Sequence, residues 1–142
     1  MTRHSVRHPQ RPDDEGRIAL LVIVLTVAVL AMIGLSVDGG GKIRALESAD
    51  DLASEAARAA GQAIYAPEAI EGGDKVVDPA AAVAAAQNYL AAAGVTGTVV
   101  VAADRKHVTV TVTILYNTVF LGLIGIDTLT ATRHATAVLL TT

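Results

Sequence analysis

The chain has 142 residues and a mass of 14.5 kDa, enough for one small domain with one additional segment. Its charged fraction of 18 % lies below the roughly 25 % of ordinary soluble domains, and its mean hydropathy is +0.49, so the composition favours a membrane-associated protein. The net charge of −3 argues against non-specific nucleic-acid binding, and the absence of cysteine excludes disulfides, cysteine-based metal centres and thiol catalysis.

An uncharged apolar run near the N-terminus begins with Ile18 and ends with Val37. Thirteen of its 20 residues are Leu, Ile or Val, and a helix of about 20 residues spans the ~30 Å hydrocarbon core of a bilayer. The run therefore predicts a transmembrane helix over residues 18–37. The alternative is a signal peptide that is cleaved after the run. Signal peptides have shorter apolar regions, of about 7–15 residues, and no A-x-A-like cleavage site follows Val37.

The charges beside this run predict its orientation. Four arginines lie among residues 1–17, whereas two basic residues, Lys42 and Arg44, follow the run closely. The excess of positive charge places the N-terminal side in the cytoplasm. We therefore expect a disordered cytoplasmic tail (1–17), a single span of the plasma membrane (18–37) and an exported domain outside the membrane (38–142).

Residues 39–64 have the alanine-rich pattern of a helix. Small apolar residues recur at spacings of three and four and form a packing stripe: Leu46, Ala49, Ala53, Ala57 and Ala60. Because methyl groups bury little area, we expect this stripe to pack against a second helix, either residues 79–93 of this chain or a helix of a partner protein near the membrane. Three consecutive glycines at 39–41 predict a break or hinge between the span and this helix.

A second helix is predicted further along the chain. Residues 66–78 have the composition of a loop, with proline, glycine and scattered acidic residues. Asp78 is a suitable N-cap for a helix over residues 79–93, and Gly94 is a suitable residue to end it.

The last part of the chain has strand-like patterns. Strands are predicted over residues 98–102, 107–115 and 128–140, and in the middle one valines and threonines alternate between two faces. The first two form a hairpin. Arg133 interrupts the apolar face of the third strand, which indicates either a sheet edge or a bulge. Together the elements predict an α+β fold with a small antiparallel sheet of about three strands.

Between the last two strands lies an apolar segment, residues 116–126, which is too short to span a membrane. Two interpretations are open. The segment is either a connection that caps the small core or a patch that contacts lipid or a partner subunit. The first interpretation suits a small domain with few aromatic residues.

No motif for catalysis, for a cofactor or for a metal emerges from the sequence. The glycines before Lys42 lack both the first glycine and the final Ser or Thr of a phosphate-binding loop. The four histidines form no pair at metal-binding spacing with a carboxylate, and Glu47, Asp50 and Asp51 have the pattern of solvated side chains on one helix. We therefore predict no enzymatic activity, no cofactor, no small-molecule substrate and no nucleic-acid partner.

An ordered set of residues links the span to the alanine-rich helix. Asp38 and Gly40 follow the span, and Ala49-Asp50 opens a helix with many alanines. A V-x-V-x-V strand, an apolar segment at 120–125 and a Thr/Ala-rich strand come later. This combination resembles TadG-like and TadE-like proteins of the Tad (Flp) pilus system over roughly residues 15–140. Residue 21, the fifth after Gly16, is Leu where pilin-like members have Glu, which favours the TadG-like side.

The resemblance implies a pilin-like architecture and a function. The chain is expected to be a non-enzymatic single-pass envelope protein that acts in assembly of a Tad/Flp-type pilus, as an accessory or minor pilin-like component. Its implied partners are the lipid bilayer and other pilus-assembly or pilin-like membrane proteins. Two alternatives stay open: a secreted binding module released after signal cleavage, and a membrane-anchored structural envelope protein unrelated to pili.

Overall fold

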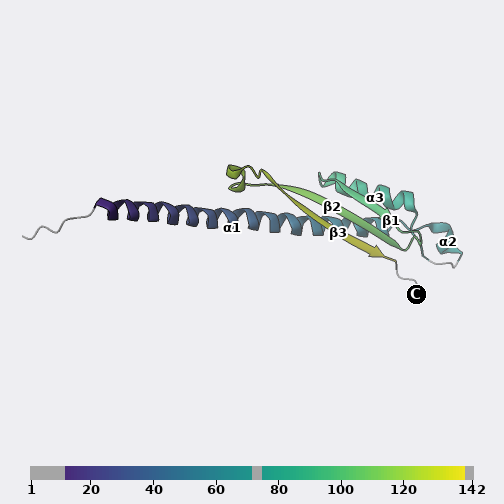
Figure 1. Cartoon of the computed structure of the whole chain (residues 1–142). Coiled ribbons are helices and arrows are strands. Elements are labelled where there is room, and N and C mark those ends of the chain that lie inside the picture. Colours follow the sequence, from purple (N-terminus) through teal and green to yellow (C-terminus); the bar gives the residue numbers. More distant parts are fainter. Residues whose placement is uncertain (1–11, 72–74, 140–142) are drawn as a thin grey trace, which may run out of the picture.

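A computed structural model of the chain describes residues 12–71 and 75–139 (Figure 1). In chain order its elements are α1 (Pro12–Gly61), α2 (Ala66–Ile70), α3 (Pro79–Ala92), β1 (Gly97–Val101), β2 (His107–Asn117), the 3₁₀ helix η1 (Leu121–Ile124) and β3 (Thr128–Val138). The α+β fold class is confirmed. Three parts of the predicted elements lie outside the described residues: 1–11 of the tail, 72–74 of the loop and 140 of the last strand.

Helix α1 is longer and more continuous than the sequence predicts. It starts at Pro12, so residues 12–17 are helical rather than part of a disordered tail. Proline suits the first turn of a helix, where its missing N–H would have no partner. The helix also continues through residues 39–41, so the predicted break is wrong. Each glycine costs about 1 kcal/mol relative to alanine in a helix, and the packing of α1 against the rest of the chain offsets that cost.

The first part of α1 extends alone, away from the other elements (Figure 1). A window within Gly16–Gly61 is long and apolar enough to cross a membrane, and 6 % of that window is buried. Ile18 and Val37, the ends of the predicted span, are both exposed. Large apolar side chains thus face outward along this part of the helix, which is the arrangement expected of a helix surrounded by lipid.

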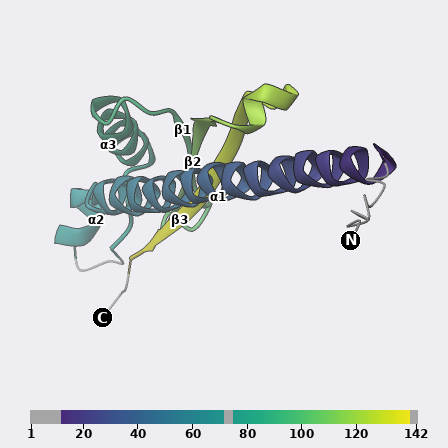
Figure 2. The same ribbon diagram turned by 90° about the vertical axis from the view of Figure 1, so that its left-hand side faces the viewer.

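The sheet is antiparallel, with strand order β1-β2-β3. Val110 of β2 lies opposite Val99 of β1 and Ala135 of β3, and the β2–β3 register continues without a bulge from the end near His107 to the end near Asn117. Arg133 therefore lies on an edge strand, which is the first of the two predicted explanations. β2 and β3 run obliquely across the second half of α1 (Figures 1 and 2).

One core joins the helices to the sheet. Three groups of buried residues form it together with Val77: Ala49, Ala53, Ala56, Ala57 and Ala60 of α1; Ala82, Ala86 and Leu90 of α3; Val108, Val110 and Val112 of β2. Both helices therefore cover the valine face of the sheet, and the threonine face is turned away from them, as the alternation in β2 predicts. We call this unit, which comprises residues 39–61 of α1 together with α2, α3 and the sheet, the head.

Local signals place most of the smaller elements correctly. The Asp78 side chain accepts hydrogen bonds from the N–H groups of Ala80 and Ala81, and Gly94 ends α3 with a φ of +72°. Two short elements were missed: α2 lies inside the segment predicted to be a loop, and η1 lies inside the apolar segment 116–126. They have five and four residues, so they give almost no helical periodicity to detect.

Candidate functional site

Asp38 is a charged residue that is fully buried, with 0 % of its surface exposed. It lies on α1 directly after the apolar run 18–37. Burial of a carboxylate is costly unless hydrogen bonds replace the lost water. The partners of this side chain therefore define the candidate site.

The Asp38 carboxylate accepts three backbone hydrogen bonds from the segment before and within η1. Oδ1 accepts from the N–H of Val119 at 2.7 Å, and Oδ2 accepts from the N–H groups of Phe120 and Leu121 at 3.0 and 2.7 Å. The Tyr116 hydroxyl also donates to Oδ1, at 3.5 Å. The first N–H groups of a helix have no partner within that helix, so the side chain of one helix caps the start of another.

These hydrogen bonds favour the ionised form of the carboxylate. Burial by itself raises the pKa of Asp38, but the backbone N–H groups of Val119, Leu121 and Phe120 and the Tyr116 hydroxyl lower it, so the pKa falls below its ordinary value of 3.8. Asp38 is thus a negative charge at neutral pH, held in place by oriented donors. It is a structural acceptor, because its oxygens are engaged by donors of this same chain.

Two glycines of α1 allow the close approach of this segment. Gly34 and Gly41 lie on the same helix face as Asp38, at spacings of four and three. A Cβ atom on Gly34 would lie 2.8 Å from the Cβ of Phe120, and one on Gly41 would overlap the end of the Tyr116 ring. Gly40, in contrast, has no atom within 4 Å of such a position. We call the face formed by Gly34, Asp38 and Gly41 the docking face.

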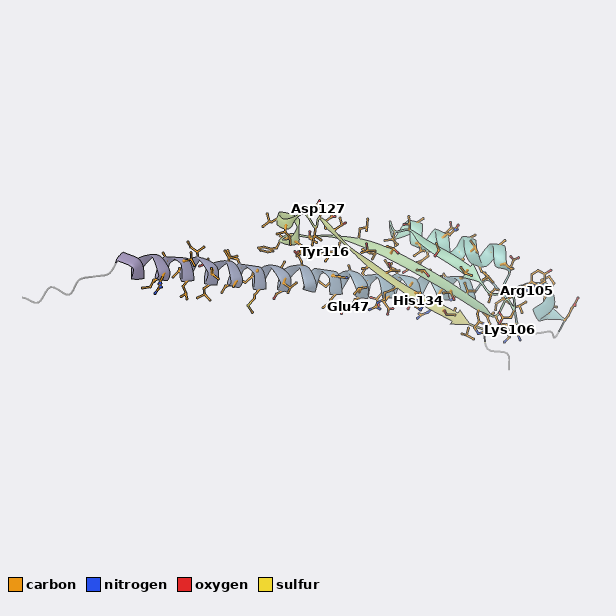
Figure 3. All side chains as sticks on the ribbon, in the orientation of Figure 1. Glu47, Arg105, Lys106, Tyr116, Asp127 and His134 are labelled. Atoms are coloured by element: carbon orange, nitrogen blue, oxygen red, sulfur yellow. The ribbon has the colours of Figure 1, made fainter. Side chains whose placement is uncertain are left out.

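The docked segment is an apolar turn, residues 119–126, closed at its base by polar contacts. The Thr118 N–H donates to the carbonyl of Asp127 at 2.9 Å, and the Thr118 hydroxyl donates to the carbonyl of Ile126. Figure 3 shows Tyr116 on the side of this region that faces α1 and Asp127 on the opposite side. The turn is therefore held twice, once at its base and once by Asp38.

The other residues singled out from the sequence lie elsewhere. Leu46 is half-buried, and Ala49, Ala53, Ala57 and Ala60 are buried against the sheet and α3 of the same chain. Asp50 is exposed and lines a shallow hollow with Glu47 and Arg133. Among the family-motif residues, Asp38 is therefore on the docking face, whereas Ala49 belongs to the core of the head.

Sequence reasoning missed the docking face as a unit. Gly34, Gly41, Tyr116 and Phe120 were not connected to Asp38, although two signals were available. The spacing of positions 34, 38 and 41 marks one helix face, and two of the four aromatic residues of the chain lie close together at 116 and 120. A charged residue between two glycines on one face, at the end of an apolar run, indicates a position where another backbone approaches.

The described residues contain no group of three His, Asp or Glu side chains arranged to hold a metal ion. The hydrogen bonds of Asp38 join two elements of the fold. Its partners are three backbone N–H groups and the Tyr116 hydroxyl, and none of them is a second acid. The arrangement defines a class of protein: an α+β head built on one long helix whose first part is able to cross a membrane.

Comparison with known families makes this class more specific. Residues 16–63 match the Tad family model, described as Flp pilus-assembly TadE/G-like. The matched region contains the apolar run, the docking face and the residues of α1 that enter the core of the head. The resemblance predicted from the sequence is confirmed over these residues. No curated protein and no solved structure matches the chain.

Proposed function

We propose that the protein is a non-enzymatic, single-pass envelope protein that acts in assembly of a Tad/Flp-type pilus, as an accessory or minor pilin-like component. One observation carries the proposal. The segment that matches the pilus-assembly family lies almost entirely in one helix, which is apolar and exposed in its first part and contributes to the core of the head in its second part. A helix of this kind holds a domain at a membrane surface.

The proposed location is the plasma membrane, with the N-terminus in the cytoplasm and the head outside. The arginines among residues 1–17 support this orientation, because positive flanking charge is retained on the cytoplasmic side. Asp38 supports the position of the boundary. A charged residue directly after the apolar run is favourable where the helix leaves the hydrocarbon core.

The surface proposed for partner contacts is the exposed apolar part of α1. The packing stripe was the sequence-based proposal for these contacts, but its alanines are buried within the head, where a partner has no access to them. Residues 18–33, in contrast, are exposed on all sides of the helix. Within a bilayer such a helix associates with others through close packing, for which Ala28 is small enough to serve as a contact.

Genetic complementation combined with crosslinking tests the proposal. We expect a deletion in the native host to abolish or strongly reduce pili on electron micrographs, and the wild-type chain to restore them. A photo-crosslinker at Leu25 or Met32, both exposed, is expected to capture other pilus-assembly or pilin-like membrane proteins. The same crosslinker at Val100, which is exposed on the head, is the control. Normal piliation after deletion would refute the proposal.

Release as a secreted module is the competing proposal, and the fold argues against it. Cleavage in the 36–41 region would cut through a continuous helix and would remove Asp38 from the three N–H groups that it caps, or leave it at a frayed end. The mass of the mature protein decides between the two. An intact apolar run supports the anchored form, and loss of all residues up to this region would establish release.

A further inference from the structure

The apolar turn (119–126) exposes large side chains that the head does not cover. The most exposed are Val119 at 62 %, Ile124 at 72 % and Leu123 at 83 %. No charged residue occurs from position 116 to position 126. Exposed apolar side chains gathered on one projection mark a contact surface rather than a random surface position.

We infer that this turn is a second membrane contact, which inserts into the outer leaflet beside the span of α1. The inference rests on the membrane anchoring in the proposed function, and it adds a second lipid-binding surface, which the apolar turn contributes. The sequence left two interpretations of this segment open: a cap for the core, or a patch that contacts lipid or a partner. The exposed side chains favour the patch, and the following observations favour lipid.

Depth along α1 is the first observation. The turn lies beside α1 (Figure 1). An open apolar groove of about 470 Å³ separates them, and its lining includes Val27 and Leu35 of the helix and Leu123 and Ile124 of η1. Val27 precedes Val37 by ten residues, which corresponds to about 15 Å along the helix axis. The groove beside the turn therefore extends along the outer half of a run that spans the ~30 Å hydrocarbon core, and the turn itself contacts α1 at Gly34 and Asp38.

The backbone of the turn is the second observation. Irregular backbone is tolerated at membrane depth only when its polar groups find partners within the protein. The Asp38 carboxylate accepts hydrogen bonds from the N–H groups of Val119, Phe120 and Leu121. Carbonyl groups of the same turn accept hydrogen bonds from the N–H groups of Leu123, Gly125 and Ile126. These six donors are satisfied without water, as a position in lipid requires.

The position of the polar residues is the third observation. Asp127 and Thr118 meet at the base of the turn, next to the sheet, while the exposed Leu123 and Ile124 belong to η1 at its far end. The polar groups are thus closest to the head and the apolar ones closest to the middle of the span. This gradient matches the change from water to hydrocarbon at the outer surface of a bilayer.

Site-directed fluorescence measures the depth of the turn directly. The chain contains no cysteine, so Leu123→Cys introduces a unique labelling site for a polarity-sensitive fluorophore. The full chain is reconstituted into vesicles of phosphatidylcholine and phosphatidylglycerol, with nitroxide groups on the acyl chains as lipid-phase quenchers and iodide as the aqueous quencher. We expect the label at position 123 to be quenched several-fold more by the nitroxide lipids, and several-fold less by iodide, than a label at position 100.

Val100→Cys is the matched control, because Val100 is an apolar residue with 62 % exposure on β1 of the same head. Leu25→Cys, in the middle of the apolar run, reports on the anchor itself. Equal iodide quenching at positions 123 and 100, with position 25 quenched by lipid, would overturn the inference and leave the anchor intact. Protection of position 123 from both quenchers would show a protein contact and would also overturn it. Failure of lipid quenching at position 25 would overturn the anchor and this inference together.

Discussion

Asp38 connects parts of the chain that are 81 to 83 residues apart, through hydrogen bonds to three consecutive N–H groups. A side chain in this position acts as an N-cap supplied by another element, and it fixes the start of η1 relative to α1. The two neighbouring glycines of the docking face remove the side chains that would keep the two backbones apart.

Replacement of Asp38 is expected to release the apolar turn. Asp38→Ala leaves the N–H groups of Val119, Phe120 and Leu121 without their acceptor, and Asp38→Asn keeps one acceptor oxygen of two, so the loss should increase from wild type to Asn to Ala. Limited digestion of the full chain in detergent by chymotrypsin, with cleavage after Phe120 and Leu121, measures this release. Asp50→Ala, at an exposed carboxylate, should digest like the wild type. Equal rates for all variants would contradict the capping role.

The docking-face glycines provide a second, steric prediction. Gly34→Ala and Gly40→Ala both gain about 1 kcal/mol of helix propensity. Only Gly34→Ala places a methyl group against Phe120, and overpacking of this kind costs about 1–3 kcal/mol. The difference between the two variants therefore isolates the steric cost. Thermal unfolding of the full chain in micelles, followed by circular dichroism, should rank Gly40→Ala highest. A higher midpoint for Gly34→Ala than for Gly40→Ala would show that the turn is not held against α1.

At the scale of elements, the two faces of β2 are expected to respond differently to charge. Val110 is fully buried between the sheet and the helices, whereas Thr111 lies on the opposite face, paired with Thr98 and His134. Val110→Asp places a carboxylate in an apolar core without a partner and should cost several kcal/mol of unfolding free energy. Thr111→Asp should cost much less. Equal losses of thermal stability would mean that the register of β2 is wrong.

The alanines of α1 set how closely the helix approaches the sheet. Ala53 and Ala57 are both buried in the core of the head. The double variant Ala53→Leu/Ala57→Leu forces the helix away from its neighbours, with an expected loss of about 1–3 kcal/mol per site. Ala84→Leu, on the exposed face of α3, is the matched control and should stay near the wild-type midpoint in the same thermal unfolding experiment. A double variant with unchanged stability would show that the packing stripe accommodates larger side chains and does not set the distance between α1 and the sheet.

Local patterns account for much of this architecture. The alternation in β2, the cap at Asp78 and the glycine at 94 act over a few residues, so the sequence predicts these elements within one or two positions. The glycines at 39–41 misled the prediction, because their cost is local while the packing that offsets it is not. Position 41 requires glycine because Tyr116, which is 75 positions away in the chain, lies next to it in the fold. The docking face was missed for the same reason, because its two sides are far apart in the chain.

At the scale of the whole molecule, the orientation in the membrane is the property to test. With the N-terminus in the cytoplasm, protease added to intact spheroplasts should remove the head and leave an N-terminal tag protected, because four arginines favour retention of that end. Immunoblots of tags at both ends read the result. Permeabilised cells, in which both tags are digested, are the control. A C-terminal tag that stays protected in intact spheroplasts would refute this orientation.

The unbroken course of α1 has a mechanical consequence. Because one helix of 50 residues enters both the apolar run and the head, a change of tilt within the bilayer is transmitted as in a lever. The 24 residues that follow Val37, up to Gly61, form an arm of about 36 Å, so a tilt change of about 10° would displace the far end of the head by about 6 Å. A neighbouring protein that pushes on the span would thereby move the outer end of the head, and the apolar turn, with its contact close to the pivot, would resist that motion.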